Sequence, residues 1–146
     1  MSTPEPGYTQ PDTTLIGEEH IRRYEETNGE VGHAWNGATC LVLTTTGRKS
    51  GEPRKFALIY ASDGDDLLVV ASKGGAPSHP GWYLNVVANP EVTVQVLGDR
   101  FPARARTATP DERARLWEIV NERWPNYAVY ATRTTREIPV VVLERQ

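Results

Sequence analysis

The lysines of this chain are confined to two short glycine-containing segments. There are three of them, Lys49, Lys55 and Lys73, against thirteen arginines spread along the sequence. The first two lie in the segment 47–55 and the third in the segment 72–75. Ammonium groups beside glycine-bearing backbone, where N–H groups are free to donate, suit an anionic ligand such as a phosphate. Two basic hairpin turns exposed to solvent are the alternative.

The second of these segments runs from the end of an expected strand into an expected helix, with Ser78 at the position of an N-cap. Free N–H groups and the positive end of the helix dipole would then form a second anion site. An ordinary strand-to-helix loop would have a similar composition. The first segment is not a phosphate-binding P-loop, because Lys49 follows Arg48 instead of glycine and leads into a strand.

Two tyrosines, Tyr127 and Tyr130, follow a proline that ends a helix, Pro125. Residues three apart share a face if the segment is helical. These side chains are therefore candidates for the mouth of a pocket, where a hydroxyl could donate a hydrogen bond or a proton to a substrate. Packing in the core is the alternative for aromatic residues of this kind.

Other familiar kinds of site find no support in the sequence. The histidines, His20, His33 and His79, lack metal-ligand spacing, and no cysteine or carboxylate cluster completes a metal site. No motif of a hydrolase nucleophile occurs. The net charge of -3 argues against nucleic acid as the main partner. The single cysteine, Cys40, excludes an internal disulfide and fits a reducing cytoplasm, and no apolar stretch approaches the roughly 20 residues that span a bilayer.

Periodicity and turn signals predict how the chain positions these residues. Residues 1–14 are polar and proline-bearing and are expected to be a disordered lead, followed by one domain over 15–146. The expected strands are 38–46, 54–62, 67–72, 91–97, 100–107 and 138–143. The expected helices are 15–28, 78–88 and one that starts at Thr109 with a capping box. This pattern predicts an α+β fold, a small and mostly antiparallel β-barrel of about six strands with two or three packed helices.

Four motifs in a fixed order carry a family resemblance. They are Leu-Thr-Thr-Thr-Gly-Arg-Lys-Ser-Gly at 43–51, Val-Val-Ala-Ser-Lys-Gly-Gly-Ala-Pro at 69–77, His-Pro-Gly-Trp-Tyr-Leu-Asn at 79–85 and Arg-Glu-Ile-Pro at 136–139. Each motif alone is weakly specific, whereas their order and spacing together are specific. Together they resemble the deazaflavin-dependent nitroreductase family of actinobacteria.

The resemblance implies a split β-barrel similar to that of FMN-binding oxidoreductases. It also implies an enzyme that transfers a hydride from reduced 8-hydroxy-5-deazaflavin, coenzyme F-420, to a small oxidised acceptor. Quinones, nitroaromatics and activated enones are the implied acceptor classes. The phosphate and oligoglutamate tail of this coenzyme are anionic, which would explain why the lysines lie in two glycine-containing segments. An FMN-dependent enzyme of the same barrel class and a non-catalytic carrier of the deazaflavin are the alternatives.

The resemblance also assigns residues to the site. It implies cofactor contacts at Arg48, Lys49, Ser50, Arg54, Lys55, Ala57, Leu58, Ile59, Ala71, Ser72, Lys73, Gly74, Gly81, Trp82 and Asn85. It places Tyr127 and Tyr130 beside the acceptor. The chain departs from the family at two of these positions, with Ala57 in place of a common proline and Gly81 in place of a larger residue.

Overall fold

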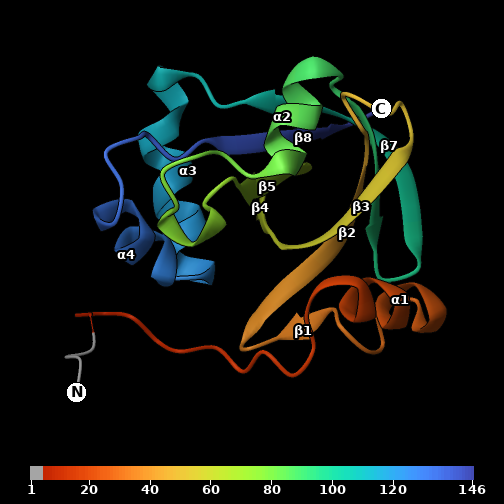
Figure 1. Cartoon of the computed structure of the whole chain (residues 1–146), viewed down its shortest axis with the longest axis horizontal. Helices are drawn as coiled ribbons and strands as arrows, with labels where there is room; N and C mark the ends of the chain where they lie inside the picture. Colours follow the sequence, from red (N-terminus) through yellow and green to blue (C-terminus); the bar gives the residue numbers. More distant parts are fainter. Residues whose placement is uncertain (1–4) are drawn as a thin grey trace.

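A curled antiparallel sheet is the framework of the protein (Figure 1). The computed structural model describes residues 5–146, and eight strands lie within them. They are β1 (Ala34–Trp35), β2 (Ala38–Thr46), β3 (Pro53–Ile59), β4 (Ala61–Asp63), β5 (Asp66–Val70), β6 (Glu91–Val96), β7 (Asp99–Thr107) and β8 (Val140–Arg145). Hydrogen bonds place them in the order β1-β2-β6-β7-β8-β5-β4, and β3 also pairs with β2. The helices are α1 (Gly17–Thr27), the short 3-10 helix η1 (Lys73–Gly75), α2 (Gly81–Ala88), α3 (Pro110–Arg123) and α4 (Asn126–Thr132).

The segment formed by β3 and β4 brings the two ends of the sheet together. Only Tyr60 separates these strands, yet β3 pairs with β2 and β4 pairs with β5. The sheet therefore curls into the expected split barrel. The single strand predicted over 54–62 was wrong in one respect, because it breaks at Tyr60 and its two parts pair with different neighbours. Periodicity cannot show this change, since it reports which residues are buried and not which strand lies beside them.

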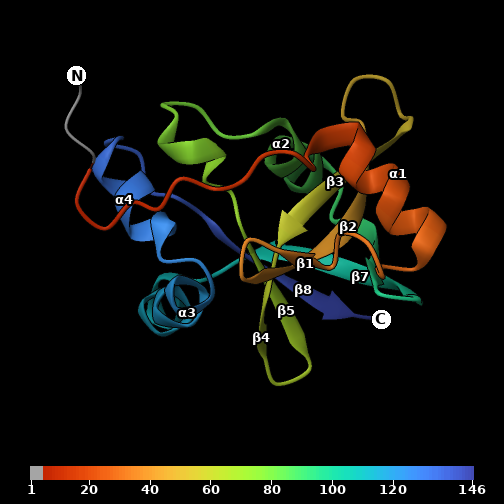
Figure 2. The ribbon, with the colours of Figure 1, turned by 90° about the horizontal axis from the view of Figure 1, so that it is seen from below.

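Both faces of the sheet are covered. On β8, Val141 and Leu143 belong to a hydrophobic cluster that includes residues of α2, whereas Val140 and Val142 belong to a second cluster that includes residues of α3 and α4. Figure 2 shows α3 and α4 together at one end of the molecule, away from α1 and α2. Because both faces of β8 are buried, its sequence is apolar without alternation, as the run 138–143 predicted.

The start of α3 confirms the predicted capping box. Thr109 and Glu112 satisfy each other's backbone groups, and the N–H of Thr109 donates to Oε1 of Glu112 at 2.9 Å. Arg106 of β7 forms an ion pair with the same carboxylate. The hydrogen bond from Arg106, followed by that from the Thr109 backbone, lowers the pKa of Glu112 to about 2. The ion pair between Arg106 and Glu112 therefore joins α3 to the sheet, in addition to the packing of the apolar face of α3.

Glu112→Gln tests the contribution of this charge, because glutamine keeps the capping geometry. The pKa of Glu112 is lower than its ordinary value of 4.5, so its stabilising effect is present at neutral pH and declines as the pH falls below that value. The pair is partly exposed, so we expect the variant to lose about 1 kcal/mol or less at pH 7. Urea unfolding at pH 7, 5 and 3 should show the deficit shrinking. A deficit that stays constant would mean that the capping geometry, and not the charge, had been lost.

The segment expected to be a disordered lead, residues 1–14, is described from residue 5 onward, and its first four residues lie outside the described part. The described portion lies against the domain through two reciprocal pairs of hydrogen bonds. The backbone of Thr9 pairs with the Asn126 side chain at 2.8 and 2.9 Å, and the backbone of Asp12 pairs with the Asn36 side chain at 2.8 Å in both directions. Figure 1 shows this segment (red) running from beside α4 to the start of α1. Among the described residues, no helix is both long and apolar enough to cross a membrane.

Candidate functional site

Two hollows are lined in part by residues of β3. The first, called here the anion hollow, has a volume of about 270 Å³ and is lined by Gly47, Arg48, Lys49, Ser50, Arg54, Phe56, Gly81 and Asn85. The second, called here the aromatic cavity, has the same volume and is lined by Pro11, Ile16, Gly17, His20, Trp35, Cys40, Ala57, Leu58, Ile59, Val70, Ser72, Lys73, Gly74, Trp124, Tyr127 and Tyr130. Phe56 of the anion hollow and Leu58 of the aromatic cavity are two residues apart and therefore share a face of β3, so one ligand can lie along this face and reach both hollows.

The turn between β2 and β3 forms the floor of the anion hollow. Two backbone hydrogen bonds of 2.8 Å close it, from Gly47 to Glu52 and from Gly51 to Gly47. A Cβ on Gly47 would lie 2.6 Å from Oγ of Ser50, so only glycine fits without a shift of that side chain. The Ser50 Oγ in turn accepts from the Glu52 N–H at 3.1 Å. The turn therefore holds its own shape while it carries Arg48 and Lys49 at its tip.

Asn85 of α2 holds one of these cations in place. Its side chain is 4% exposed, and Oδ1 accepts from the Arg48 backbone at 3.2 Å and from the Arg48 Nη1 at 2.9 Å. Its Nδ2 donates to Oγ1 of Thr45 at 3.0 Å. Both the oxygen and the nitrogen of the Asn85 side-chain amide therefore have hydrogen-bond partners within the protein. Asn85 orients Arg48, and through Arg48 it shapes the anion hollow.

The anion hollow carries positive charge without a compensating acid. Within residues 5–146, no carboxylate lies within ion-pair distance of Arg48, Lys49 or Arg54. Arg54 reaches toward the turn, with its Nη2 3.4 Å from Oγ of Ser50. Cations gathered on a turn with exposed backbone favour an anionic ligand over a neutral one.

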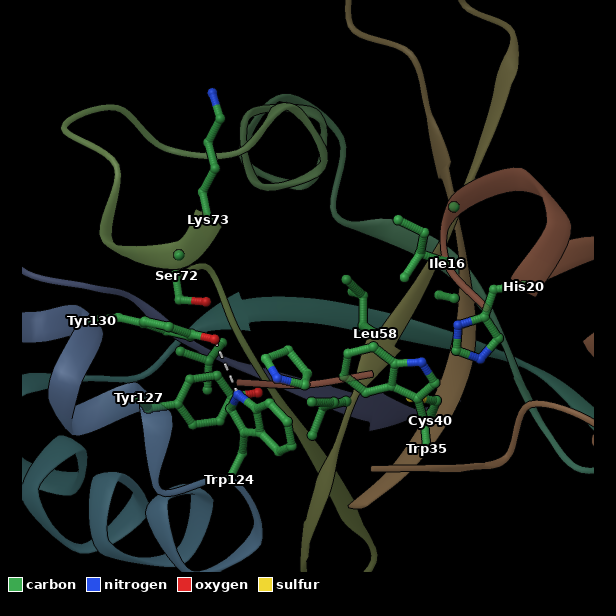
Figure 3. A pocket seen from close by; sticks show the side chains of 16 residues that line it. Ile16, His20, Trp35, Cys40, Leu58, Ser72, Lys73, Trp124, Tyr127 and Tyr130 are labelled. Carbon is green, nitrogen blue, oxygen red and sulfur yellow. Dashed lines mark hydrogen bonds between the residues drawn. The ribbon is translucent and has the colours of Figure 1, made fainter. Parts of the chain in front are cut away.

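The other two lysines lie elsewhere. Lys55 forms an ion pair of 2.6 Å with Glu25 of α1 and lines neither hollow. Lys73 stands at the edge of the aromatic cavity, with Nζ 3.5 Å from Oγ of Ser78, and Figure 3 shows its side chain pointing away from the aromatic rings. The structure therefore does not bring the three lysines to one point.

Two more of the expected contact residues do not line either hollow. Ala71 is fully buried, and Trp82 is 4% exposed and packs in the hydrophobic cluster covered by α2. The helix predicted over 78–88 begins only at Gly81, with Pro80 and not Ser78 at the N-cap. Prolines at 77 and 80 explain the difference, because the residue before a proline is disfavoured in helical conformation. The expected N-cap at Ser78 was therefore wrong.

The two tyrosines of α4 face the aromatic cavity together, as Figure 3 shows. Their ring centroids are 6.2 Å apart with an angle of 72° between the planes. The Tyr130 oxygen accepts from Nε1 of Trp124 at 3.3 Å, which leaves the Tyr130 hydroxyl proton available to a ligand. Tyr127 is 5% exposed, and burial raises the pKa of its phenol far above the ordinary value. Tyr127 therefore lines the cavity and also packs in the hydrophobic cluster beneath α3 and α4.

Three further aromatic residues complete the cavity, and the sequence offered no signal for them. The ring of His20 stacks on Trp35 at 6.2 Å, and Trp35 lies 5.6 Å from Trp124. The His20 Nε2 lies 2.8 Å from the carbonyl oxygen of Gly32, and because a carbonyl only accepts, this nitrogen carries the proton. These residues come from α1, β1 and the end of α3, so only the folded chain brings them together.

The residues of the two hollows fit a ligand with one anionic part and one flat, apolar part. The cationic turn supplies unpaired donors for the first, and the aromatic walls supply contact area for the second. A metal ion has no comparable site, because the described residues contain no cluster of three or more His, Cys, Asp or Glu side chains that could hold one. Coenzyme F-420, with a deazaflavin ring and an anionic tail, matches this arrangement.

Comparisons with known proteins agree with the site. A family model described as F420H(2)-dependent quinone reductase matches residues 17–145. An F420H(2)-dependent quinone reductase of Mycobacterium tuberculosis is 50% identical over 131 residues, which cover 87% of this chain and 88% of that protein.

Solved structures give the same result. The chain resembles an F420-H2 dependent reductase with 43% identity and a TM-score of 0.68, over 72% of this chain and 93% of that one. It also resembles a domain-swapped dimer with 39% identity and a TM-score of 0.71, over 86% and 95% of the two chains. The resemblance identified in the sequence is thereby confirmed, with quinone reduction as the activity that the matched model names. The chain belongs to the F420H(2)-dependent quinone reductase family.

Proposed function

We propose that this chain reduces quinones with coenzyme F-420 bound along β3 across both hollows. Family membership gives the cofactor and the reaction class. The observation that supports the placement is the face of β3 that carries Arg54, Phe56 and Leu58, because it runs from the uncompensated cationic turn to the aromatic cavity. When bound, the reduced coenzyme supplies a hydride. The protein's own part is to bind, to orient, to exclude water and to provide a proton.

The anion hollow holds the tail of the coenzyme in this proposal. Arg48, Lys49 and Arg54 contact its phosphate and carboxylates, and Ser50 adds a hydroxyl. The ring lies beside β3 and the loop after β5, in contact with Ala57, Leu58, Ile59, Ser72, Lys73 and Gly74. Gly81 borders the hollow without a side chain, and a Cβ there would meet no atom within 4 Å, so this departure from the family widens the hollow.

The quinone lies against the tyrosines of α4. Addition of one hydride and one proton converts a quinone to a hydroquinone, so the acceptor oxygen needs a hydrogen-bond donor as negative charge develops on it. We assign this role to the Tyr130 hydroxyl, whose oxygen already accepts from Trp124. Nitroaromatics and activated enones develop charge on oxygen in the same way and are further candidate acceptors. The reducing cytoplasm is the proposed location, in line with the single buried thiol of Cys40.

A single-turnover experiment tests the activity. Protein loaded with reduced F-420 is mixed with menadione, and oxidation of the coenzyme is followed by its absorbance. We expect oxidation much faster than that of free reduced coenzyme at the same menadione concentration. An equal rate would instead indicate a non-catalytic carrier.

Titration with F-420 and FMN tests the cofactor. The several negative charges of the F-420 tail suit the anion hollow better than the single phosphate of FMN. We therefore expect tighter binding of F-420, by fluorescence, and a loss of affinity as salt is added. Equal or tighter binding of FMN would overturn the cofactor assignment.

Asn85→Ala tests the anion hollow without removing a charge. The variant frees the Arg48 guanidinium from its anchor, and we expect F-420 affinity to fall by roughly fivefold, equivalent to about 1 kcal/mol of lost positioning. Fluorescence titration measures this change. Asn89→Ala at the C-cap of the same helix is the control, because Asn89 lies outside both hollows and its side chain bonds only the Glu91 backbone N–H at 3.1 Å. Equal affinity in both variants would show that Arg48 needs no anchor.

A further inference from the structure

The loop that follows β5 has an unusual backbone. Lys73, Gly74 and Gly75 have φ values of +46°, +63° and +84° in succession. The left-handed region is uncommon for a residue with a side chain, and at Lys73 it is expected to cost on the order of 1 kcal/mol. Only two short-range backbone hydrogen bonds hold the turn, from Gly75 to Ser72 at 2.9 Å and from Ala76 to Lys73 at 3.1 Å. Contacts from outside the loop must therefore maintain its shape.

Arg136, in the segment before β8, supplies these contacts. Its guanidinium donates to the carbonyl oxygens of Ser72 and Ala76 at 2.8 Å each and of Ala71 at 3.2 Å. It also donates to Nδ1 of His79 at 3.0 Å, which fixes that nitrogen as unprotonated because arginine only donates. One side chain thus joins the start, the middle and the end of the 71–79 segment.

The charge of Arg136 is not neutralised by the protein. None of the ion pairs among residues 5–146 involves it, and its partners are three carbonyl dipoles and a neutral imidazole. The guanidinium is partly buried. A positive charge therefore stands directly behind the loop whose Ser72 and Gly74 line the aromatic cavity.

The same loop lies directly against the helix that presents the tyrosines. A Cβ on Gly75 would lie 2.5 Å from the backbone oxygen of Tyr130, so the two backbones are in close contact. Arg133 of the same region donates to the Gly74 carbonyl at 3.0 Å. A loop released from Arg136 would therefore lose its position relative to α4 as well as its shape.

We propose that Arg136 is a positioning residue for F-420, which it serves by holding the 72–76 turn against α4 and by placing an unpaired positive charge behind that turn. It contacts no ligand itself. This inference rests on the proposed function, since the turn is one wall of the proposed cofactor site.

Two variants of Arg136 and one matched control test the proposal. Arg136→Gln removes the charge and the fork of donors, whereas Arg136→Lys keeps a charge but cannot reach four acceptors. Arg113→Gln is the control, because Arg113 is also partly buried and contacts the segment that carries Arg136, through the Ile138 carbonyl at 2.6 Å and an ion pair with Glu137 at 3.5 Å, but makes no contact with the turn. Each protein is measured for F-420 affinity by fluorescence, for melting temperature, and for amide hydrogen exchange at Gly75 and Ala76 without cofactor.

We expect Arg136→Gln to bind F-420 about tenfold more weakly and Arg136→Lys to recover only part of the loss. Both should exchange the amides of Gly75 and Ala76 faster than the wild type, and the quinone reduction rate at saturating F-420 should stay within about threefold. Arg113→Gln should melt earlier but keep the wild-type affinity and loop exchange.

Unchanged affinity in Arg136→Gln would overturn the proposal, as would full recovery of affinity by lysine together with fast loop exchange. A wild-type protein that fails to bind F-420 would refute the proposed function instead. The exchange rates of the cofactor-free variants would then still decide whether Arg136 holds the turn.

Discussion

Tyr130→Phe is expected to slow the reduction of a quinone by roughly 100-fold, the lower end of what a positioned acid contributes. The variant keeps the ring and removes the hydroxyl, which is the group left free to donate by the hydrogen bond from Trp124. F-420 affinity should stay within about threefold, a difference below 1 kcal/mol. Stopped-flow oxidation of the bound reduced coenzyme by menadione measures the rate, and titration measures the affinity.

Tyr127→Phe is the matched control. Its phenol is 5% exposed and packs in the core, and burial raises its pKa, so its removal should affect the rate less. Melting curves separate a catalytic effect from a packing effect, because loss of packing lowers the melting temperature without lowering turnover per folded molecule. Normal rates in both variants would remove the tyrosines from the reaction and leave water as the proton source.

Lys49→Ala is expected to weaken F-420 binding by tenfold or more, since a charge-assisted hydrogen bond to phosphate contributes on the order of 1.5–3 kcal/mol. The cofactor-free variant should melt like the wild type, because no ion pair involves Lys49 among the described residues. Lys49→Arg should restore only part of the affinity, because ammonium and guanidinium groups differ in geometry. Fluorescence titration at low and high salt measures all three proteins.

Lys55→Ala is a matched comparison for Lys49→Ala, because Lys49 lies in the turn before β3 and Lys55 lies nearby in β3 itself. Lys55 is paired with Glu25 and lines neither hollow, so its removal should change F-420 affinity little. If both alanine variants lost the same affinity, the effect would come from overall charge at a distance and not from contact with the phosphate. High salt would then abolish the difference from the wild type in both.

The sequence predicted best what depends on local chemistry. The strand over 38–46 has the predicted bounds, and α3 begins where the capping residues place it. The segment 47–51 forms the predicted turn, and its first four residues line the anion hollow. Each of these features is determined within a few residues, by alternation, by a cap or by a turn that only glycine fits.

The remaining features depend on partners that are distant in the chain. Tyr60 divides one strand into two only because the barrel closes there. His20 and Trp35 reach the aromatic cavity only because α1 and β1 fold beside β3. Lys55 pairs with Glu25, which lies thirty residues earlier in the chain, and no local pattern indicates this partner. Arg136 belonged to a recognised motif, but its four acceptors lie about sixty residues away, beyond any local pattern.

Because β3 passes both hollows, the proposed site is sensitive to the length of the molecule that binds along it. A strand advances about 3.3 Å per residue, so Arg54 and Leu58, which share a face of β3, stand roughly 13 Å apart along a strand held by seven paired residues of β2. Only a molecule whose charged group and ring are separated by a matching spacer can satisfy both ends at once. Deleting one residue from β3 would shorten this span by one step and turn the remaining side chains to the opposite face. If the coenzyme lies along β3 as proposed, cofactor choice depends on length as well as on charge.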